Sequence, residues 1–470
     1  MERDSVMGAS IIEGTKAAPT CWGDVLILGL GKSGKAAASY CLNLLGGRVK
    51  SVTIAAGEKN DAALEFAARC EALGAHVVFD MYTFKDTYDV CIVSPGISQF
   101  SRFYENAKAA STEVISEVEF AWRESPADTR WVAVTGTNGK TTTTSLITHI
   151  LKCAGGRVAA VGNIGNTCIE AVGNGEADVY VCEASSFQLA SCQAFAPEVA
   201  VLLNITPDHL DRYDHCMQNY VDAKMRILQN QEETDAFVYW NDDPIIRKEL
   251  EKYQIKAKKC PFSILKKEGM IGYLADGQYV IEYPTPFNME QESLALTGKH
   301  NMYNSLAAGI TADIAGVKNE VIRQSLSDFE GVEHRLEKVV RVRGVDYIND
   351  SKATNVDACW YALESMKTPT VLILGGKDKG NDYEAIAELV RKKCVGLVFL
   401  GADNGKLHAF FDSFGIPIAD THSMKDCVEA CYRMARPGDT VLLSPCCASF
   451  DLFKNMEDRG EQFKSLVRAL

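Results

Sequence analysis

Val132-Ala-Val-Thr-Gly-Thr-Asn-Gly-Lys140-Thr141-Thr142 is an apolar strand that runs into a glycine loop, a lysine and two hydroxyl residues opening a helix. In this order, backbone N–H groups of the loop and the helix N-terminus face an anion, the lysine adds a positive charge, and the first threonine can reach Mg²⁺. We therefore expect a nucleotide-hydrolysing protein that binds the phosphates of ATP through Gly136, Thr137, Asn138, Gly139, Lys140, Thr141 and Thr142.

The spacing of this loop narrows the class of nucleotide-binding protein. The common phosphate loop has a glycine at the position of Val134, so the loop here is the shorter G-x-x-G-K-T. Ordinary GTPases and motor ATPases fit this spacing less well.

Length and composition are those of a soluble protein with several domains. The chain has 470 residues, of which 47% are hydrophobic and 24% charged, and about three domains are expected. The net charge of −13 argues against non-specific binding to nucleic acid or to an anionic membrane surface. We therefore expect neither nucleic acid nor membrane insertion, and any phosphate site must be built locally.

The cysteines and the N-terminus indicate a cytoplasmic protein. None of the 16 cysteines forms a C-x-x-C pair, which disfavours a zinc or thioredoxin-like site and favours reduced thiols in the cytosol. The segment Met1 to Trp22 has no apolar core of a signal peptide, and no run of ~18 apolar residues occurs anywhere.

Alternating strands and helices predict an α/β protein of three domains, each with a mostly parallel sheet. We place a Rossmann-like domain at 1–118, a phosphate-loop ATPase-like domain at 119–331 and a second Rossmann-like domain at 332–470. Short peripheral strands and loops are expected near 260–290.

The first domain carries Gly29, Gly31 and Gly34 as G-x-G-x-x-G after a strand. A dinucleotide-binding unit also needs an acid near the end of its second strand to hold a ribose, and Ile54-Ala55-Ala56 stands there instead. This disfavours an NAD- or FAD-dependent oxidoreductase. Two readings of the glycines stay open: a pyrophosphate on the backbone, or close packing of a strand against a helix.

Polar residues gather where parallel strands end, which is where ligands bind in open α/β sheets. Glu183 ends one strand and is the expected Mg²⁺ ligand, with helix capping as the alternative. His209 lies in an Asp/His-rich turn that suits a metal or a substrate, and Asn163 lies in a glycine-rich turn. Lys224 is on a helix where periodicity alone predicts a solvated lysine.

Later strand ends carry the groups that a nucleotide and a dicarboxylate need. Asn301 and Asn304 share one helix face and could read a base or ribose, although Asn301 could instead cap the helix. Arg335 could reach a phosphate or be a linker charge. Lysines and hydroxyls after the third-domain strands suit a small dicarboxylate.

Taken together, the motifs resemble the Mur ligase family of ATP-dependent ligases over nearly the whole chain. The matching stretches are Gly136 to Thr142, Glu183 to Gln188, Pro207 to Arg212, Gly298 to Asn301, His334-Arg335 and Asn349 to Asn355. Asp350-Ser-Lys-Ala-Thr-Asn and Ser444-Pro-Cys-Cys-Ala-Ser-Phe-Asp are similar to the branch that adds D-glutamate to UDP-N-acetylmuramoyl-L-alanine through an acyl phosphate.

The resemblance implies a role for each candidate residue. Lys140, Glu183, His209 and Lys224 would be catalytic, with two Mg²⁺ ions held by Thr141, Glu183, His209 and a carbamylated Lys224. The ATP site would add Asn301, Arg335 and Asp350. The UDP-substrate would contact Lys32, Ser33, Ser94, Pro95, Gly96 and Asn163, and D-glutamate would contact Lys352, Thr354, Lys379 and Ser449. The resemblance also implies a cytoplasmic enzyme of peptidoglycan precursor synthesis, and we expect a monomer.

Two departures and three alternatives accompany this prediction. Ala55 and Ala56 stand where related enzymes often have Thr-Arg, and Met456 where an aromatic residue can contact glutamate, so contacts to uridine and glutamate must differ in detail. The alternatives are another amino-acid ligase of the family, a regulatory nucleotide switch, and a Rossmann oxidoreductase. A folate polyglutamate ligase would not need the first domain.

Overall fold

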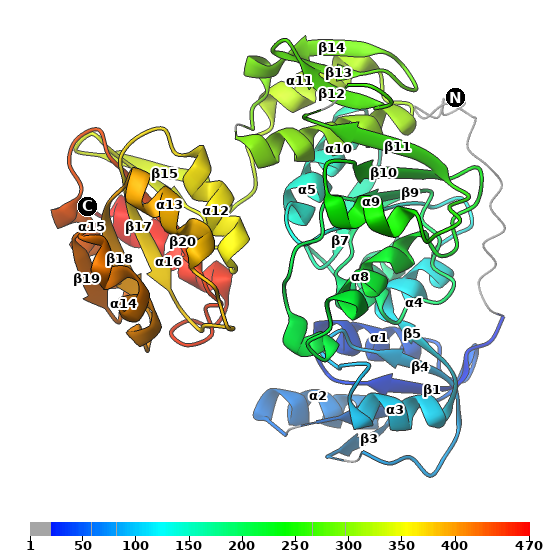
Figure 1. Ribbon diagram of the computed structural model, residues 1–470. Helices are drawn as coiled ribbons and strands as arrows, with labels where there is room; N and C mark the ends of the chain where they lie inside the picture. Colours follow the sequence, from blue (N-terminus) through cyan, green and yellow to red (C-terminus); the bar gives the residue numbers. More distant parts are fainter. Residues whose placement is uncertain (1–19, 58, 81, 266, 297) are drawn as a thin grey trace. The chain divides into compact units, whose positions relative to one another are not determined.

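The computed structural model describes residues 20–57, 59–80, 82–265, 267–296 and 298–470. Residues 1–19, which make up most of the N-terminal segment for which no signal peptide was expected, lie outside these ranges, as does Thr297. The described residues form two compact units, one from the described residues up to Leu294 with Tyr303–Phe329 and one from those within 295–302 with Glu330–Leu470 (Figure 1).

The strands of the described residues form three sheets, which confirms the predicted α/β class with mostly parallel sheets. The first sheet is wholly parallel in the order β3-β2-β1-β4-β5, the Rossmann-like order expected for a domain that binds a nucleotide at its strand ends. Its strands are β1 Gly23–Leu28, β2 Val49–Ala56, β3 His76–Phe79, β4 Tyr88–Val93 and β5 Ser111–Ser116.

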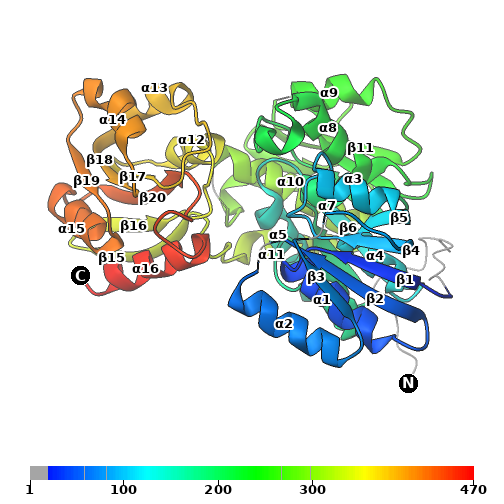
Figure 2. The same cartoon turned by 90° about the horizontal axis from the view of Figure 1, so that it is seen from below.

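Side chains of β1 alternate between two helical layers because successive residues of a strand point to opposite faces. Val25 and Ile27 pack with helices α1 Lys32–Asn43 and α2 Asp61–Ala72, whereas Leu26 and Leu28 pack with α3 Arg102–Ala109. Figure 2 shows α1 and α2 on one side of this sheet and α3 on the other. Both faces are therefore buried, and ligands can approach only the edges and strand ends.

The second sheet has the order β14-β13-β12-β11-β10-β9-β6-β8-β7 and is parallel except for the peripheral hairpins β12–β13 and β13–β14. These hairpins confirm the short strands expected near 260–290. The strands are β6 Arg130–Thr135, β7 Val158–Gly162, β8 Val179–Glu183, β9 Val199–Leu202, β10 Ala236–Trp240, β11 Lys258–Ser263, β12 Gly272–Ala275, β13 Gln278–Ile281 and β14 Phe287–Glu290.

The helices of this part of the chain connect the strands and begin close to the strand ends. They are α4 Glu117–Glu124, α5 Lys140–Cys153, α6 Cys168–Gly173, α7 Ser186–Leu189, η1 Leu210–Tyr213, α8 Met217–Met225, η2 Arg226–Leu228, α9 Pro244–Leu250, η3 Gln291–Ser293, α10 Lys299–Ile314 and α11 Asn319–Asp328. Because β6 lies between β8 and β9, the loops that follow these three strands meet at one edge.

The third sheet has the order β15-β16-β20-β17-β18-β19, antiparallel only at β15–β16. Its strands are β15 Glu337–Val342, β16 Val345–Asn349, β17 Thr370–Gly375, β18 Cys394–Leu400, β19 Ile418–Thr421 and β20 Thr440–Cys446. Leu372 faces the layer of α12 Val356–Ser365, α13 Glu384–Lys393 and α14 Gly405–Phe411, and Val371 faces α15 Met424–Met434 and α16 Met456–Arg468. Figure 2 shows these two layers. A short turn, η4 Asp412–Phe414, follows α14.

The predicted boundaries at 118/119 and 331/332 stay predictions. The sheets span 23–116, 130–290 and 337–446, and the first two belong to the same compact unit.

Candidate active site

The phosphate loop between β6 and α5 is held in shape by Asn204, which follows β9. The backbone N–H of Asn138 donates to Asn204 Oδ1 at 2.8 Å, and Asn204 Nδ2 donates back to Asn138 O at 2.9 Å. The N–H of Thr137 donates to Asn204 O at 2.9 Å. Sequence reasoning gave Asn204 no role, although an amide at the end of the neighbouring strand was a usable signal.

Two glycines of the loop stand where other residues would not fit. Gly136 has a φ of 152° and Gly139 a φ of 87°. A Cβ atom on Gly139 would lie 2.4 Å from Asn304 Oδ1, which also accepts a hydrogen bond from Thr143 Oγ1 at 3.2 Å. Asn304 therefore packs against the phosphate loop and the start of α5. Asn301 lies one turn earlier on α10, which begins at Lys299, so Asn301 is not the helix cap.

Two lysines converge on one carbonyl oxygen of this loop. Lys140 Nζ donates to Gly136 O at 2.9 Å and to Thr137 O at 2.8 Å, and Lys224 Nζ donates to the same Gly136 O at 2.7 Å. Lys224 is 1% exposed, so the prediction of a solvated lysine from periodicity was wrong. Helix α8 has nine residues and directs the Lys224 side chain toward the loop, with the centroid of the Tyr220 ring 4.6 Å from Lys224 Nζ.

The setting of Lys224 lowers its pKa well below the usual value. Burial is the main cause, because a charged ammonium is poorly solvated there, and the positive charge of Lys140 adds to it. Asp208 opposes the shift. The neutral amine is the form that can react as a nucleophile.

Glu183, at the end of β8, is buried, and only one of its two carboxylate oxygens accepts a hydrogen bond from the described residues. Its Oε1 accepts a hydrogen bond from Asn163 Nδ2 at 2.9 Å, and Oε2 is buried without a hydrogen-bond partner in the described part of the chain. The alternative role of helix cap is wrong, because Ser185 caps α7 in a capping box with Gln188. A buried carboxylate oxygen without a partner suits a hard divalent cation.

His209 lies beside this edge in a strained turn, with a φ of 53°. Its ring meets Phe187 at 5.3 Å between centroids, and its Nε2 is 3.6 Å from Asp208 Oδ2. The imidazole is 40% exposed and thus accessible to a ligand.

Arg212 is a residue to which the sequence assigned no separate role. Its Nη1 donates to Gly96 O and its Nη2 to Pro95 O, each at 2.5 Å, and Nη2 also donates to Ile97 O. The guanidinium stacks 4.6 Å from the Phe187 ring. Arg212 thereby ties the turn after β4 to the loop after β9.

The glycine turn after β1 shows the close packing that one reading of its motif predicted, whereas the pyrophosphate reading stays a prediction. A Cβ on Gly34 would lie 2.0 Å from Gly29 O and 2.5 Å from Ser94 Oγ, so Gly29 and Gly34 serve close packing. Gly31 has open space around its Cβ position, which leaves backbone available to a ligand. Ser33 lies in the first turn of α1.

A lysine of this turn reaches the second sheet. Lys32 Nζ donates to Gly165 O at 2.6 Å, so Lys32 lies beside the glycine-rich turn that carries Asn163. Ala55 and Ala56 are buried and offer no polar side chain.

In the second unit, Asp350 is buried after β16. Ser444 Oγ donates to Asp350 Oδ2 at 2.9 Å and the Leu336 N–H donates to Oδ1 at 3.2 Å. Burial raises the pKa of Asp350 to about 6, against the lowering effect of Arg335. Arg335 Nε is buried without a partner in the described residues. Burial lowers the pKa of His300 to about 3, and the positive charge of Arg335 contributes to this lowering. Arg335 thus lies near Asp350 and His300, the neighbour of Asn301.

The residues predicted to bind the amino acid lie on three loops of this unit. Lys352 and Thr354 share a turn in which the Thr354 N–H donates to Lys352 O at 3.0 Å, Ser449 is buried after β20, and Lys379 is exposed after β17. Arg459 joins two of these loops by donating from Nη2 to Ser351 O at 2.7 Å and from Nη1 to Cys447 O at 3.1 Å. Sequence reasoning missed Arg459, which has no local signal.

Replacing Asp350 by asparagine tests its buried carboxyl. A folded-state pKa of about 6, above the unfolded value of 3.8, means that the folded protein binds the proton more tightly. The free energy of unfolding therefore loses a contribution as pH rises from about 4 to about 6. Relative to wild type, Asp350→Asn should gain on the order of 3 kcal/mol between pH 4 and 7, measured by urea unfolding. A constant difference across this range would contradict the assignment.

Comparisons with known proteins point to one family. The family model described as Mur ligase middle domain matches residues 134–312, and the model described as Mur ligase, glutamate ligase domain matches residues 334–447. A UDP-N-acetylmuramoylalanine–D-glutamate ligase of Bacteroides fragilis is 61% identical over 383 residues, covering 81% of this chain and 86% of that protein. The enzyme of the same name from Salinibacter ruber is 42% identical over 456 residues, covering 94% and 97%.

Solved structures agree with the fold. A MurF ligase from Thermotoga maritima in complex with ADP has a TM-score of 0.59 at 18% identity, covering 89% of this chain and 95% of that one. A UDP-N-acetylmuramate-alanine ligase from the same organism has a TM-score of 0.58 at 18% identity, covering 95% and 99%.

Proposed function

The chain belongs to the Mur ligase family, and on that premise we propose that it joins D-glutamate to UDP-N-acetylmuramoyl-L-alanine while ATP becomes ADP and phosphate. The 61% identity to an enzyme of that name carries the choice of substrates. The phosphate loop with Lys140 and Lys224 on Gly136 O supports the phosphoryl chemistry. The product would be a precursor of peptidoglycan.

Two Mg²⁺ ions fit the residues at the edge of the second sheet. The buried Oε2 of Glu183 lacks a partner among the described residues, and Thr141 lies in the first turn of α5, directly after the phosphate loop. We propose that Thr141 and Glu183 hold one ion and that His209 and Lys224 hold the other. When bound, the ions would neutralise charge on the transferred phosphoryl group.

Lys224 would need to be carbamylated to act as a metal ligand. An ammonium repels a cation, whereas the carbamate formed from a neutral amine and CO₂ is an oxygen-donor anion of the kind Mg²⁺ prefers. The lowered pKa of Lys224 supports this proposal because it favours the neutral amine.

The reaction proceeds in two displacements. A carboxylate oxygen of the UDP-substrate attacks the γ-phosphorus, the bond to the ADP oxygen breaks, and an acyl phosphate forms. The amine of D-glutamate then attacks the acyl carbon, loses a proton, and expels phosphate to leave the amide. Lys140 and the loop N–H groups stabilise the charge on the γ-phosphate, and substrate positioning supplies much of the acceleration.

The remaining contacts follow the family pattern. We propose that Asn301, Arg335 and Asp350 contact ATP, that the UDP-substrate lies against Lys32, Ser33, Ser94, Pro95, Gly96 and Asn163, and that D-glutamate contacts Lys352, Thr354, Lys379 and Ser449. We also propose a cytoplasmic monomer. No helix in the described ranges combines the length and the apolar character that a membrane crossing requires.

Arg212→Ala tests whether the turn after β4 receives the UDP-substrate. Loss of the hydrogen bonds to Pro95, Gly96 and Ile97 should loosen this turn and raise KM for that substrate about tenfold, with a smaller change in KM for ATP. Steady-state kinetics measure both constants. The matched control is Arg157→Ala, which removes an exposed arginine paired with Asp178. Equal KM values in wild type and Arg212→Ala would remove the turn from the proposed site.

The experiment that tests the function is phosphate release with ATP, UDP-N-acetylmuramoyl-L-alanine and a panel of amino acids. We expect release only when D-glutamate is present together with the UDP-substrate. Activity with L-lysine or meso-diaminopimelate instead of D-glutamate would be consistent with the family but would contradict D-glutamate as the amino-acid substrate. ATP hydrolysis without either co-substrate would favour a regulatory switch.

A further inference from the structure

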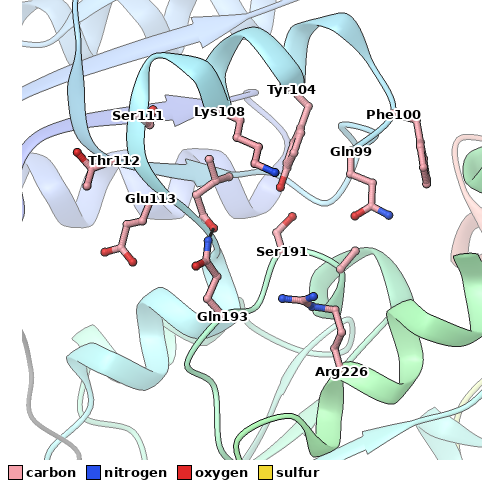
Figure 3. A pocket seen from close by; sticks show the side chains of 12 residues that line it. Gln99, Phe100, Tyr104, Lys108, Ser111, Thr112, Glu113, Ser191, Gln193 and Arg226 are labelled. Atoms are coloured by element: carbon pink, nitrogen blue, oxygen red, sulfur yellow. Dashed lines mark hydrogen bonds between the residues drawn. The ribbon is translucent and has the colours of Figure 1, made fainter. Parts of the chain in front are cut away.

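A polar cavity of 430 Å³ lies in the first unit, apart from the residues of the proposed active site. One wall comes from α3, the residues just before it and the start of β5, and the other from the segment after α7 and from Arg226, the first residue of η2 (Figure 3). Its volume is within the range of small-molecule sites. Its lining residues are Gln99, Phe100, Tyr104, Lys108, Ser111, Thr112, Glu113, Val114, Ala190, Ser191, Gln193 and Arg226.

The charged side chains that line the cavity, Lys108, Arg226 and Glu113, carry a net positive charge. Glu113 is the one carboxylate of the lining, and it pairs with Arg123, whose Nη1 lies 2.9 Å from its Oε1 and whose Nη2 donates to Oε2 at 3.1 Å; Arg123 also pairs with the buried Glu119. Arg226 donates from Nε to Cys192 O at 3.1 Å. Within the described ranges, neither Arg226 nor Lys108 forms an ion pair with a carboxylate. Two cations in a small cavity attract an anion.

Hydroxyl groups lie between these cations. Tyr104 is 9% and Ser191 6% exposed, and their hydroxyls interact across the cavity, with Arg226 close enough to affect Tyr104. Figure 3 shows the side chains of Tyr104, Lys108, Ser191 and Arg226 directed toward the same space. Ser111 Oγ is buried and has no hydrogen-bond partner in the described part of the chain. Buried hydroxyls without full partners favour a polar ligand over an apolar one.

The cavity shares no residue with the proposed substrate sites, although Gln99 and Phe100 lie in the same connection between β4 and α3 as Ser94, Pro95 and Gly96. None of the residues proposed to bind ATP, the UDP-substrate or D-glutamate lines it. Its Ser111 wall is the amino end of β5, whereas Ser94 follows the carboxyl end of the parallel neighbour β4. Because β4 and β5 run parallel, Ser111 lies at the opposite end of these strands from Ser94 and the glycine turn.

We propose that this cavity binds a small organic or inorganic dianion bearing carboxylate or phosphate groups. Arg226 and Lys108 pair with its charge, and the hydroxyls of Tyr104 and Ser191 donate to its oxygens. The ligand joins α3 and β5 to Arg226, which directly follows α8 and lies two residues beyond Lys224, and so tightens the segment that carries this lysine.

The test is calorimetric titration of the full chain with sodium succinate and, separately, with sodium phosphate. Lys108→Gln and Tyr104→Phe should each weaken binding about tenfold, the usual effect of losing one charge-assisted or buried hydrogen bond. The matched control Lys152→Gln removes one exposed lysine from α5 and should bind like wild type. Preference for succinate or for phosphate identifies the ligand group.

Arg226→Gln should abolish binding, but it also removes the bonds to Cys192, so its melting temperature is measured alongside. Lys108→Gln and Tyr104→Phe keep the test independent of that variant. The proposal is overturned if neither anion binds saturably up to about 10 mM, or if these two variants bind as tightly as Lys152→Gln. Binding and melting temperature do not depend on ligase activity, so failure of the proposed function would be distinguishable.

Discussion

Lys140→Ala is expected to abolish phosphate release, lowering it at least about a thousandfold in the presence of all three substrates. Lys140 Nζ lies over the phosphate loop, within 2.9 Å of Gly136 O and 2.8 Å of Thr137 O. We expect it there to stabilise charge that develops on the γ-phosphate. Among the described residues, Lys224 is the other lysine that donates to the Gly136 carbonyl. Phosphate release and ADP binding are the measurements.

The control for this variant lies on the same helix. Lys152 is an exposed residue of the last turn of α5, and Lys152→Ala should release phosphate at the wild-type rate. Melting temperatures should agree within a few degrees for all three proteins. Wild-type turnover by a folded Lys140→Ala would contradict the assignment of the phosphate loop.

Lys224→Met is expected to lower ligase activity by about a hundredfold or more while leaving the protein folded. Methionine matches the apolar stem and removes a buried nitrogen whose charge is unfavourable there, so the melting temperature should not fall greatly. Lys224→Arg should also be inactive, because a guanidinium cannot form a carbamate. Activity of the wild type should fall when CO₂ and bicarbonate are removed.

Carbamylation has a readout that does not depend on activity. Protein equilibrated with ¹³C-labelled bicarbonate should show a carbamate carbon signal by NMR, and Lys224→Met should lack it. Lys248→Met, which removes an exposed lysine from α9, should retain both the signal and the activity. A carbamate signal that persists in Lys224→Met would assign the modification to another lysine.

Local motifs predicted the fold class and the chemistry because each motif needs only consecutive residues. The order of strand, glycine loop, lysine and helix is preserved from the sequence into β6 and α5. Glu183 ends β8 as expected, and the absence of an acid after Ile54 disfavoured a dinucleotide enzyme. Matching motifs in the same order then identified the family.

Periodicity failed at Lys224 because a short polar helix does not indicate what covers it. Lys224 and Gly136 are 88 residues apart, and only the fold brings them within 2.7 Å. The same holds for Arg212 and Gly96, 116 residues apart, and for Arg459 and Ser351, 108 residues apart. No pattern within one segment encodes such pairs.

The sequence by itself determined the family and the α/β class, and it supplied the residues proposed to carry the phosphoryl chemistry, since these inferences depend on local order and chemical type. Only the tertiary structure decided which of these residues are buried, which backbone turns are tied together, and that a cationic cavity lies apart from them. The physical reason is that burial and pKa depend on the surroundings of a side chain, and those surroundings come from distant parts of the chain.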